Sequence, residues 1–521
     1  MKISRLKKIR VVVSILFLLL FSILFLDFTN FVSPRYTNYI TYLQFVPSLL
    51  KFINVFNITA AGFIFVIILT LILGRIYCST VCPLGILQDV ISFFARKLNK
   101  KKYYHPVKEN NRLRYSFLFL AVIAILTGSM IVITLLDPYS NFGRIFTQLF
   151  KPVVLAANNF LAYTLTIADI YSVYPQEIKP ANIWLMLFPI FFLSLIVWMS
   201  YKHGRLFCNT VCPVGSLLGL LSRLSFYKVE INKDNCIGCK LCERVCKSGC
   251  IDKENKTVDY SRCVDCFNCF TVCPTEGIKY SRNYPWKNKE VTSVEFDYKK
   301  REFISSIVWF SIGTLGTTYA QKKIISKKPS TFSILKKIPV SPPGSVSINN
   351  FTGSCTACSI CISACPSQVL QPSFLDYGFI GMLQPKMDFN IGFCNFECVI
   401  CSQVCPGGAI LPIALEKKKL TQLGKAKFVK ENCIVFTEKT DCGACAEHCP
   451  TKAITMVPYE NIKSPEVKDE YCIGCGACEY ACPTKPYKAI YVEGNPVHLT
   501  AKKKEEKKLQ EKIDYNDDFP F

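Results

Sequence analysis

Six groups of four cysteines constrain this chain more than any other feature of its sequence. The first two groups stand close together and comprise Cys236, Cys239, Cys242, Cys246, Cys263, Cys266, Cys269 and Cys273. Their C-x2-C-x2-C-x3-C spacing is that of bacterial [4Fe–4S] sites, in which three thiolates bind one cluster and the fourth cysteine binds the neighbouring cluster. We therefore predict cluster A on Cys236, Cys239, Cys242 and Cys273, and cluster B on Cys263, Cys266, Cys269 and Cys246.

The second half of the chain repeats this pattern four times, with two departures. The second of these groups has one extra residue in its first gap, and the third lacks a nearby first cysteine, for which Cys433 is the only candidate. Fourth cysteines are expected to be exchanged, either between sequence neighbours or between first and last and between second and third groups. The predicted ligands are Cys355, Cys358, Cys361, Cys365, Cys394, Cys398, Cys401, Cys405, Cys433, Cys442, Cys445, Cys449, Cys472, Cys475, Cys478 and Cys482.

Zinc sites and disulfides explain these cysteines less well than iron–sulfur clusters. Structural zinc sites use two C-x2-C pairs separated by a dozen or more residues, and none of the regular groups has that spacing. Disulfides would not need so uniform a spacing. We expect six [4Fe–4S] clusters. Cys250 is left over and is either a small buried residue or a rival fourth ligand to Cys246, which no proline follows.

Four stretches without Asp, Glu, Lys or Arg approach the length of a bilayer span. They are Val11–Leu26, Phe52–Gly74, Tyr115–Leu136 and Pro180–Tyr201. The first follows a basic start like that of a signal peptide, but no small-residue cleavage site comes after it, so we expect a retained anchor. A further uncharged run, 152–168, is short and polar, and we interpret it as interfacial.

Charge sets the expected orientation of these spans. Basic residues gather between 96 and 114, after the second span, whereas the loop before that span holds only Arg35 and Lys51. The positive-inside rule then places the N-terminus and the 75–114 loop in the cytoplasm. Much of the net charge of +24 flanks the apolar runs, which favours membrane topology over nucleic-acid binding as its explanation.

Two of the spans are followed by the same twelve-residue motif. Residues 74–85 read GRIYCSTVCPLG and residues 204–215 read GRLFCNTVCPVG. Each motif lies at the cytoplasmic end of its span, and the i, i+4 spacing points both cysteines the same way on a helical turn. The four thiols of Cys78, Cys82, Cys208 and Cys212 are therefore expected to converge. They would hold a metal or cluster, act as a redox dithiol, border a quinone pocket, or merely end the helices.

The junction between the two halves bears on where the second half resides. The sequence Lys300-Arg301-x-Phe303-Ile304 opens an uncharged run, 303–321, that we interpret as a marginal fifth span. Its start is similar to a twin-arginine export signal with lysine in place of the first arginine. Such a route carries folded cargo, so we expect the four-cluster domain outside the cytoplasm. The alternative is an ordinary basic flank, with that domain inside.

The expected fold class is multi-domain, with an all-α polytopic membrane domain and α+β ferredoxin-like domains. The expected divisions are a four-span membrane domain, a two-cluster domain, a linker with the possible fifth span, a four-cluster domain and a charged tail. Their ranges are 1–228, 229–285, 286–347, 348–495 and 496–521.

Several cofactors and reactions are not expected. The four histidines, at 105, 203, 448 and 498, all lie outside the predicted spans, so no bis-histidine haem is expected in the membrane. No G-x-G-x-x-G follows a strand and no phosphate-binding loop occurs, so no NAD site is expected. The chain has carriers of electrons and no evident catalytic substrate domain. Its cofactors would supply the chemistry, and the protein would position them.

These motifs resemble two known components. Residues 1–285 resemble the membrane quinol dehydrogenase of periplasmic nitrate reductase systems (NapH-type), and residues 299–490 resemble its four-cluster ferredoxin partner (NapG-type). The resemblance implies a multi-pass protein of the bacterial inner membrane that passes electrons from a quinol, such as menaquinol, to a periplasmic reductase or cytochrome. It also makes Cys78, Cys82, Cys208 and Cys212 the membrane-edge cysteines of that family.

Two departures from the resemblance leave other functions open. The halves are fused here, and the export signal is Lys-Arg instead of Arg-Arg. One alternative is an assembly factor for a metalloenzyme or oxidase, in which the membrane-edge cysteines handle the metal. Another is a redox relay that faces the cytoplasm.

Overall fold

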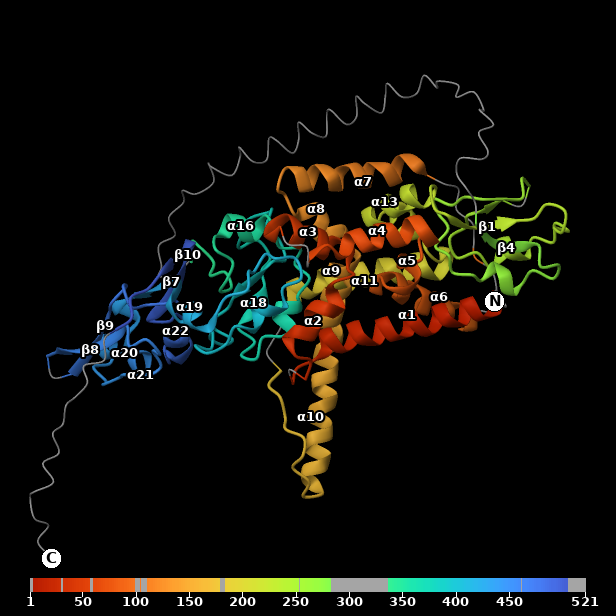
Figure 1. Cartoon of the computed structure of the whole chain (residues 1–521). Coiled ribbons are helices and arrows are strands. Elements are labelled where there is room, and N and C mark those ends of the chain that lie inside the picture. The colour runs from red at the N-terminus through yellow and green to blue at the C-terminus, as the bar shows by residue number, and fades with distance from the viewer. Residues whose placement is uncertain are drawn as a thin grey trace, which may run out of the picture. The chain divides into compact units, whose positions relative to one another are not determined.

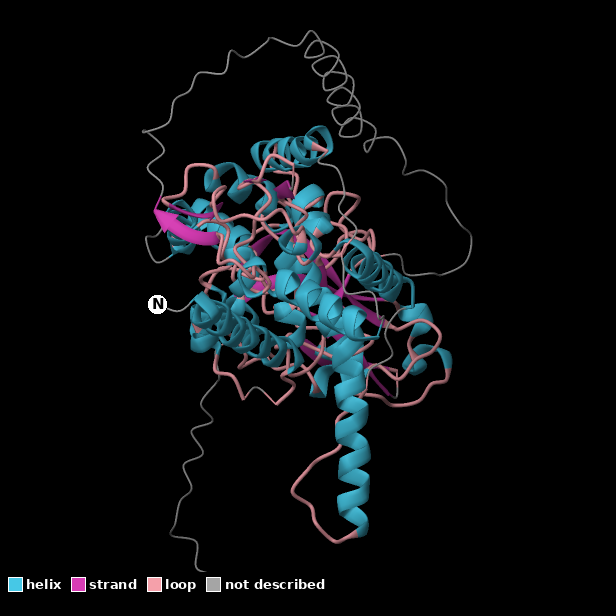
Figure 2. Ribbon diagram, turned by 90° about the vertical axis from the view of Figure 1, so that its right-hand side faces the viewer, coloured by secondary structure: helices cyan, strands magenta, loops and turns pink. Residues whose placement is uncertain are grey.

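The computed structural model describes residues 3–29, 31–56, 60–98, 104, 110–178, 183–252, 254–282, 336–460 and 462–504. The predicted fifth span 303–321, its Lys-Arg signal, most of the linker and the end of the charged tail lie outside the described residues. The first half is helical, and the two cysteine-rich regions combine short helices with two-stranded sheets (Figures 1 and 2).

Helices dominate residues 3–222. The longest is α1 (Ile3–Leu26), whose 24 residues rise about 36 Å at 1.5 Å per residue. The others are α2 (Pro34–Thr41), α3 (Phe45–Val55), α4 (Gly62–Leu73), α5 (Tyr77–Thr80), α6 (Pro83–Leu98), α7 (Asn111–Leu126), α8 (Ile131–Leu136), α9 (Pro138–Ile145), η2 (Phe146–Phe150), α10 (Lys151–Ile167), α11 (Ile183–His203), α12 (Leu206–Thr210) and α13 (Pro213–Ser222).

Two helices in the described part of the chain are long and apolar enough to cross a membrane. They are Arg5–Leu26 within α1 and Ile183–His203, which is α11. The other two predicted spans are not continuous helices. The run 52–74 is divided because α3 ends at Phe56 in a left-handed conformation, with φ 50°. The run 115–136 is divided because Gly128 adopts φ 70° between α7 and α8.

The start of α4 has a steric cause. A Cβ atom on Gly62 would lie 1.9 Å from the carbonyl oxygen of Tyr42. This glycine therefore lets the helix begin against the loop that follows α2. The close contact between Gly62 and Tyr42 therefore helps to divide the run 52–74, which is one continuous apolar segment in the sequence.

Helix α10 corresponds to the run that we interpreted as interfacial. In Figure 1 it runs across the direction of α1, and in both views it extends away from the other helices (Figures 1 and 2). The loop after it packs back along its side, where Asn159 Nδ2 donates to the carbonyl of Gln176 at 2.7 Å. Much of its surface is apolar and exposed, including Phe160 and Tyr163.

The first cysteine-rich region is built on two small antiparallel sheets. Strand β1 (Tyr227–Ile231) pairs with β4 (Ile278–Arg282), and β2 (Ile251–Asp252) pairs with β3 (Thr257–Val258). Two short helices carry cysteines between them, α14 (Leu241–Arg244) and the 3-10 helix η3 (Cys269–Thr271).

The second cysteine-rich region holds three further antiparallel pairs. These are β5 (Leu370–Pro372) with β6 (Pro385–Met387), β7 (Thr421–Phe428) with β10 (Ile490–Thr500), and β8 (Ile454–Tyr459) with β9 (Ile462–Val467). Its helices are α16 (Ile348–Thr352), α17 (Ile360–Ser363), α18 (Ile400–Val404), α19 (Leu415–Leu420), η4 (Lys430–Asn432), α20 (Ile434–Thr437), α21 (Ala444–Glu447) and α22 (Ala477–Ala481).

Helix α1 contacts both cysteine-rich regions, at its opposite ends. Near its start, Lys7 Nζ donates to Thr271 Oγ1 of η3 at 3.2 Å. At its end, the Phe25 carbonyl accepts a hydrogen bond of 2.7 Å from Ser363 Oγ of α17. Between these points α1 packs against α5, which carries the first twelve-residue motif. One helix therefore joins three groups of cysteines.

Candidate redox centres

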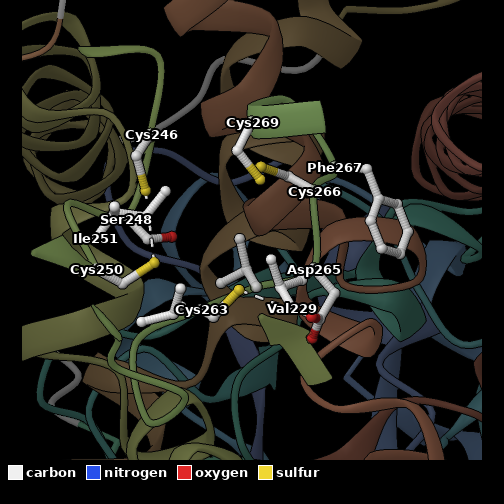
Figure 3. A pocket seen from close by; sticks show the side chains of 12 residues that line it. Val229, Cys246, Ser248, Cys250, Ile251, Cys263, Asp265, Cys266, Phe267 and Cys269 are labelled. Atoms are coloured by element: carbon white, nitrogen blue, oxygen red, sulfur yellow. Dashed lines mark hydrogen bonds between the residues drawn. The ribbon is translucent and has the colours of Figure 1, made fainter. Parts of the chain in front are cut away.

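The predicted cluster B cysteines line one cavity (Figure 3). Cys246, Cys263, Cys266 and Cys269 surround it together with apolar side chains such as Val229 and Phe267. The four thiols come from two loops that lie 17 or more residues apart in the sequence, and strands β1 to β4 bring those loops together. The donor set is all sulfur, which suits an iron–sulfur cluster.

Cys250 lines the same cavity as a fifth thiol. Its Sγ lies 3.5 Å from Cys246 Sγ (Figure 3). In other groups the residue four positions after the last cysteine is small and carries no donor atom: Gly277, Val369, Ala409 and Ala453. Cys250 occupies this position in the first group, so its thiol faces the cluster site. The choice between Cys246 and Cys250 as fourth ligand stays open.

The predicted cluster A cysteines lie nearer the surface. Burial raises the pKa of Cys242, and the thiolates of Cys236 and Cys239 raise it further, which shows that the three are close. Cys273 packs with Cys242 in the same apolar cluster. Cys239 is exposed, so cluster A is the more accessible of the two for a redox partner.

In the second region, each of the first two groups lies near the last cysteine of the other group. Burial raises the pKa of Cys361 well above that of an ordinary thiol, and the thiolates of Cys355, Cys358 and Cys405 add to the effect. Likewise, burial raises the pKa of Cys401, as do Cys394, Cys365 and Cys398. The geometry therefore points to one site on Cys355, Cys358, Cys361 and Cys405, and another on Cys394, Cys398, Cys401 and Cys365.

The last two groups are exchanged in the same way. Cys433, Cys442, Cys445 and Cys482 line one cavity. Cys449 instead lies with the other set, where burial raises the pKa of Cys478, and Cys475, Cys472 and Cys449 raise it further. The structure is consistent with exchange between sequence neighbours, one of the two patterns that the spacing left open. It also places Cys433 where the third group lacked a first cysteine.

The two twelve-residue motifs fold around each other. Cys78 and Cys82 lie within electrostatic reach of Cys208, and so does Cys212. All four thiols are buried. We call this convergence of Cys78, Cys82, Cys208 and Cys212 the four-thiol site. The predicted convergence is thus present, between α5 and α12.

The arginine of each motif binds the backbone of the other motif. Arg75 Nη2 donates to the carbonyl of Cys208 at 3.2 Å, and Arg205 Nη1 donates to the carbonyl of Cys78. The last glycine of each motif makes room for this exchange. A Cβ atom on Gly85 would lie 2.4 Å from the Cys78 carbonyl oxygen, and one on Gly215 would lie 2.2 Å from that of Cys208. The two motifs therefore hold each other through crossed hydrogen bonds from Arg75 and Arg205, which we call the reciprocal clamp.

The same motifs bind the cluster B loops. Arg75 Nη1 and Arg114 Nη2 both donate to the Ser261 carbonyl, at 2.8 and 2.7 Å. The Arg205 amide donates to the Lys247 carbonyl at 2.9 Å. Because Lys247 follows Cys246 and Ser261 shortly precedes Cys263, these bonds place cluster B beside the four-thiol site.

One carboxylate balances the cations at this junction. Asp89 pairs with Arg205 at 2.9 Å, Arg10 at 3.0 Å and Lys247 at 3.1 Å. Burial by itself would raise the pKa of Asp89, but the three cations hold it well below its usual range. Arg75 forms no ion pair within the described residues, although it is fully buried, and its Nη2 faces Cys78 Sγ at 3.9 Å. Burial raises the pKa of Cys82, Cys208 and Cys212, and Arg205 and Arg75 counter part of this rise at Cys208.

Buried tyrosines lie between the four-thiol site and the four-cluster region. Tyr77 lies within electrostatic reach of Cys82 on one side and Asp137 on the other. Tyr139 lies close to Cys358 and Asp137, and it packs against Phe21 and Phe25 of α1. These aromatic residues fill the space between two groups of thiols with polarisable side chains.

The spacing did not reveal the residues that support these sites. Arg75, Arg205 and their glycines were visible in the repeat, but only as a helix stop. Asp89 gave no sequence signal. His448 is exposed, and its Nδ1 lies 3.0 Å from the Ala444 carbonyl, so it faces its own helix.

Family models match four parts of the chain. A 4Fe-4S binding domain (Fer4_5) matches residues 58–101 and 184–231, which carry the four-thiol motifs. A second 4Fe-4S binding domain (Fer4) matches 229–252. Two 4Fe-4S dicluster domains, Fer4_9 and Fer4_7, match 354–410 and 440–485. The first dicluster match contains both of the first two groups, and the second contains the last two groups except Cys433.

Curated proteins similar to this chain include ferredoxin-type proteins and uncharacterised proteins. Ferredoxin-type protein NapH of Haemophilus influenzae is 23% identical, over 44% of this chain and 69% of its own length. Ferredoxin-type protein NapG of Escherichia coli is 31% identical, over 26% of this chain and 61% of its own length. An uncharacterised protein of Methanocaldococcus jannaschii is 28% identical, over 42% of this chain and 69% of its own length. No solved structure matches.

The chain is thus a homologue of the NapH and NapG ferredoxin-type proteins, and its several 4Fe-4S domains are consistent with a fusion of the two types. It is an iron–sulfur protein of electron transport. Its relatives and its two apolar helices indicate a membrane protein.

Proposed function

We propose that this protein carries electrons from a quinol through [4Fe–4S] clusters to a reductase or cytochrome outside the cytoplasmic membrane. The observation that carries the proposal is that α1 contacts η3, α5 and α17 in succession. These elements carry Cys269, Cys78 and Cys361. A carrier needs such a series of neighbouring centres.

We further propose that α1 and α11 cross the membrane with the two-cluster domain inside and the four-cluster domain outside. Support comes from the docking of these domains at opposite ends of α1, whose length suits a bilayer of about 30 Å. Helices α4 and α7 would complete a bundle of four, and α10 would lie along the outer surface. The basic residues near the start of α1 agree with the positive-inside rule.

The proposed ligands are the six quartets grouped above. Four converging thiolates fit a [4Fe–4S] cluster, which supplies reversible one-electron transfer when bound. The protein's own residues lower the free energy of burying such anionic groups. Arg75 and Arg114 do this beside cluster B by donating to the Ser261 carbonyl, and Arg205 does it at the four-thiol site by donating to the Cys78 carbonyl.

The test measures both the number of clusters in the protein and their reduction by a quinol. Anaerobically purified protein should contain about six clusters' worth of iron and acid-labile sulfide per chain. In membranes, menadiol, a menaquinol analogue, should reduce these clusters, as seen by electron paramagnetic resonance. Colourless protein would refute the cluster assignment, and intact clusters that menadiol cannot reduce would refute the quinol donor.

A second function is favoured by the four-thiol site. Four buried thiols beside unpaired positive charge would also suit a factor that handles a metal for another enzyme. A Cys78→Ser/Cys208→Ser double variant separates the two functions. Loss of electron transfer between the four-cluster region and cluster B supports the carrier, whereas intact transfer with a metal-deficient partner enzyme supports the assembly factor.

A further inference from the structure

A large cavity lies where α10 and α11 meet the four-cluster region. Its volume is about 470 Å³, within the range of pockets that bind small molecules. One wall comes from η2, α10 and the start of α11, through residues such as Gln148, Leu155 and Met186. The other wall comes from the loops that carry Cys361, Cys365 and Cys394, through Ile362, Gln368 and Ile391.

The chemistry of the wall is amphipathic. Leu155, Leu185 and Met186 form an apolar part, while Asp376, Lys386 and Asp388 form a charged part. Gln148 lies in the π-helical turn η2, and both atoms of its side-chain amide lack a hydrogen-bond partner within the described residues. The Thr147 hydroxyl also lacks one. π-helical turns are frequent at functional sites.

Lys151 ties this cavity to the predicted cluster ligands. Its Nζ donates to the Ser363 carbonyl at 2.6 Å, to Ser363 Oγ at 3.1 Å and to the Asp27 carbonyl at 3.1 Å. Ser363 stands between Cys361 and Cys365 in the chain. The cavity wall and the loop that supplies ligands to two neighbouring clusters are therefore held together.

The apolar surface beside the cavity favours a lipophilic ligand. Helix α10 exposes apolar side chains, including Phe160, Leu161 and Ile167, and it leads to the cavity through Leu155. A molecule dissolved in the membrane can reach the apolar wall along this helix. At the cavity it meets a free amide, which can both donate and accept a hydrogen bond.

We propose that this cavity is the quinol oxidation site. The inference rests on the proposed function, because it names the place where that donor binds. The quinol loses two electrons and two protons and leaves as quinone. The two electrons would pass one at a time to clusters held by the neighbouring cysteines, and the two protons would leave to the water outside through Asp376 and Asp388. Gln148 orients the quinol by hydrogen bonding.

This placement differs from a site at the membrane-edge cysteines. Quinol here delivers electrons directly into the four-cluster region. The four-thiol site then connects that region with cluster B, and it does not itself contact the quinol. The cavity therefore separates quinol oxidation from the path through the helices.

The test compares two neighbouring residues of α11 in the full-length protein. Met186 lines the cavity, whereas Leu187 is 50% exposed and does not. Met186→Trp should fill the cavity, slow menadiol-driven cluster reduction at least tenfold and abolish retention of added menaquinone-4 by the purified protein. Leu187→Trp should stay within twofold of wild type in both measurements.

Reduction by dithionite keeps the outcomes distinct. All variants should give the wild-type cluster spectrum with dithionite, which shows that the clusters are assembled. If Met186→Trp disturbs cluster assembly, Gln148→Leu replaces it, with the same expected loss of quinone retention.

If menadiol reduces the wild-type protein and the variants equally well, the cavity is not the quinol site, and the proposed function still stands. A wild-type protein with intact clusters that menadiol does not reduce removes the quinol donor itself. A cavity that retains phospholipid but no menaquinone-4 also overturns the inference.

Discussion

Asp89 faces three buried cations, and its loss would leave them unbalanced. We expect Asp89→Asn to destabilise the junction between the helices and the two-cluster domain by about 3–5 kcal/mol, the usual cost of leaving a buried charge unpaired. The temperature midpoint at which the cluster absorbance is lost on heating measures this destabilisation. Asp234→Asn, at an exposed position of the same domain, should leave the midpoint unchanged, and equal midpoints for both variants would contradict the network's role.

Cys250 offers a residue-scale test of the fourth ligand of cluster B. If Cys246 binds the cluster, Cys246→Ala should lower the iron content by about one cluster or change its spectrum, while Cys250→Ala should keep the wild-type content. The physical reason is that the thiols stand 3.5 Å apart, so only one of them needs to bind. The reverse pattern would identify Cys250 as the ligand, and unchanged content in both would show that either one serves.

Among helices and loops, the glycines that end the two motifs decide how closely α6 approaches α5 and how closely α13 approaches α12. Gly85→Ala would place a Cβ 2.4 Å from the Cys78 carbonyl and 3.1 Å from Arg205 Nη1. We expect it to open the reciprocal clamp and to slow electron flow between cluster B and the four-cluster region. Measurement is by freeze-quenched paramagnetic resonance after reduction with menadiol.

A matched glycine gives the control. At Gly407 the nearest atom to an added Cβ is 3.7 Å away, an ordinary contact. Gly407→Ala should therefore transfer electrons at the wild-type rate. If Gly85→Ala also does so, the clamp is not needed for transfer.

For the whole molecule, the main prediction concerns topology. Exposed turns exist at comparable places in both cysteine-rich regions, at Glu254 between β2 and β3 and at Glu460 between β8 and β9. An epitope inserted at 460 should be digested by protease in intact spheroplasts. One inserted at 254 should be digested only after lysis. Protection of both epitopes would place the four-cluster region inside and support the cytoplasm-facing relay.

The cysteine spacing by itself determined that this is an iron–sulfur protein. Three thiols separated by two residues each must share one short loop, so they face one site whatever the rest of the chain does. The apolar runs likewise indicated helices at α1 and α11, because length and uniform hydropathy are properties of the local sequence. The repeat also predicted that Cys78, Cys82, Cys208 and Cys212 converge.

Only the tertiary structure decided which distant residues meet. The fourth cysteine of each site comes from another loop, and spacing cannot distinguish exchange between neighbours from exchange between the ends. The breaks at Phe56 and Gly128, the reciprocal arginines and the cavity at Gln148 have the same origin. Each depends on contacts between segments far apart in the chain, and such contacts leave no local pattern in the sequence.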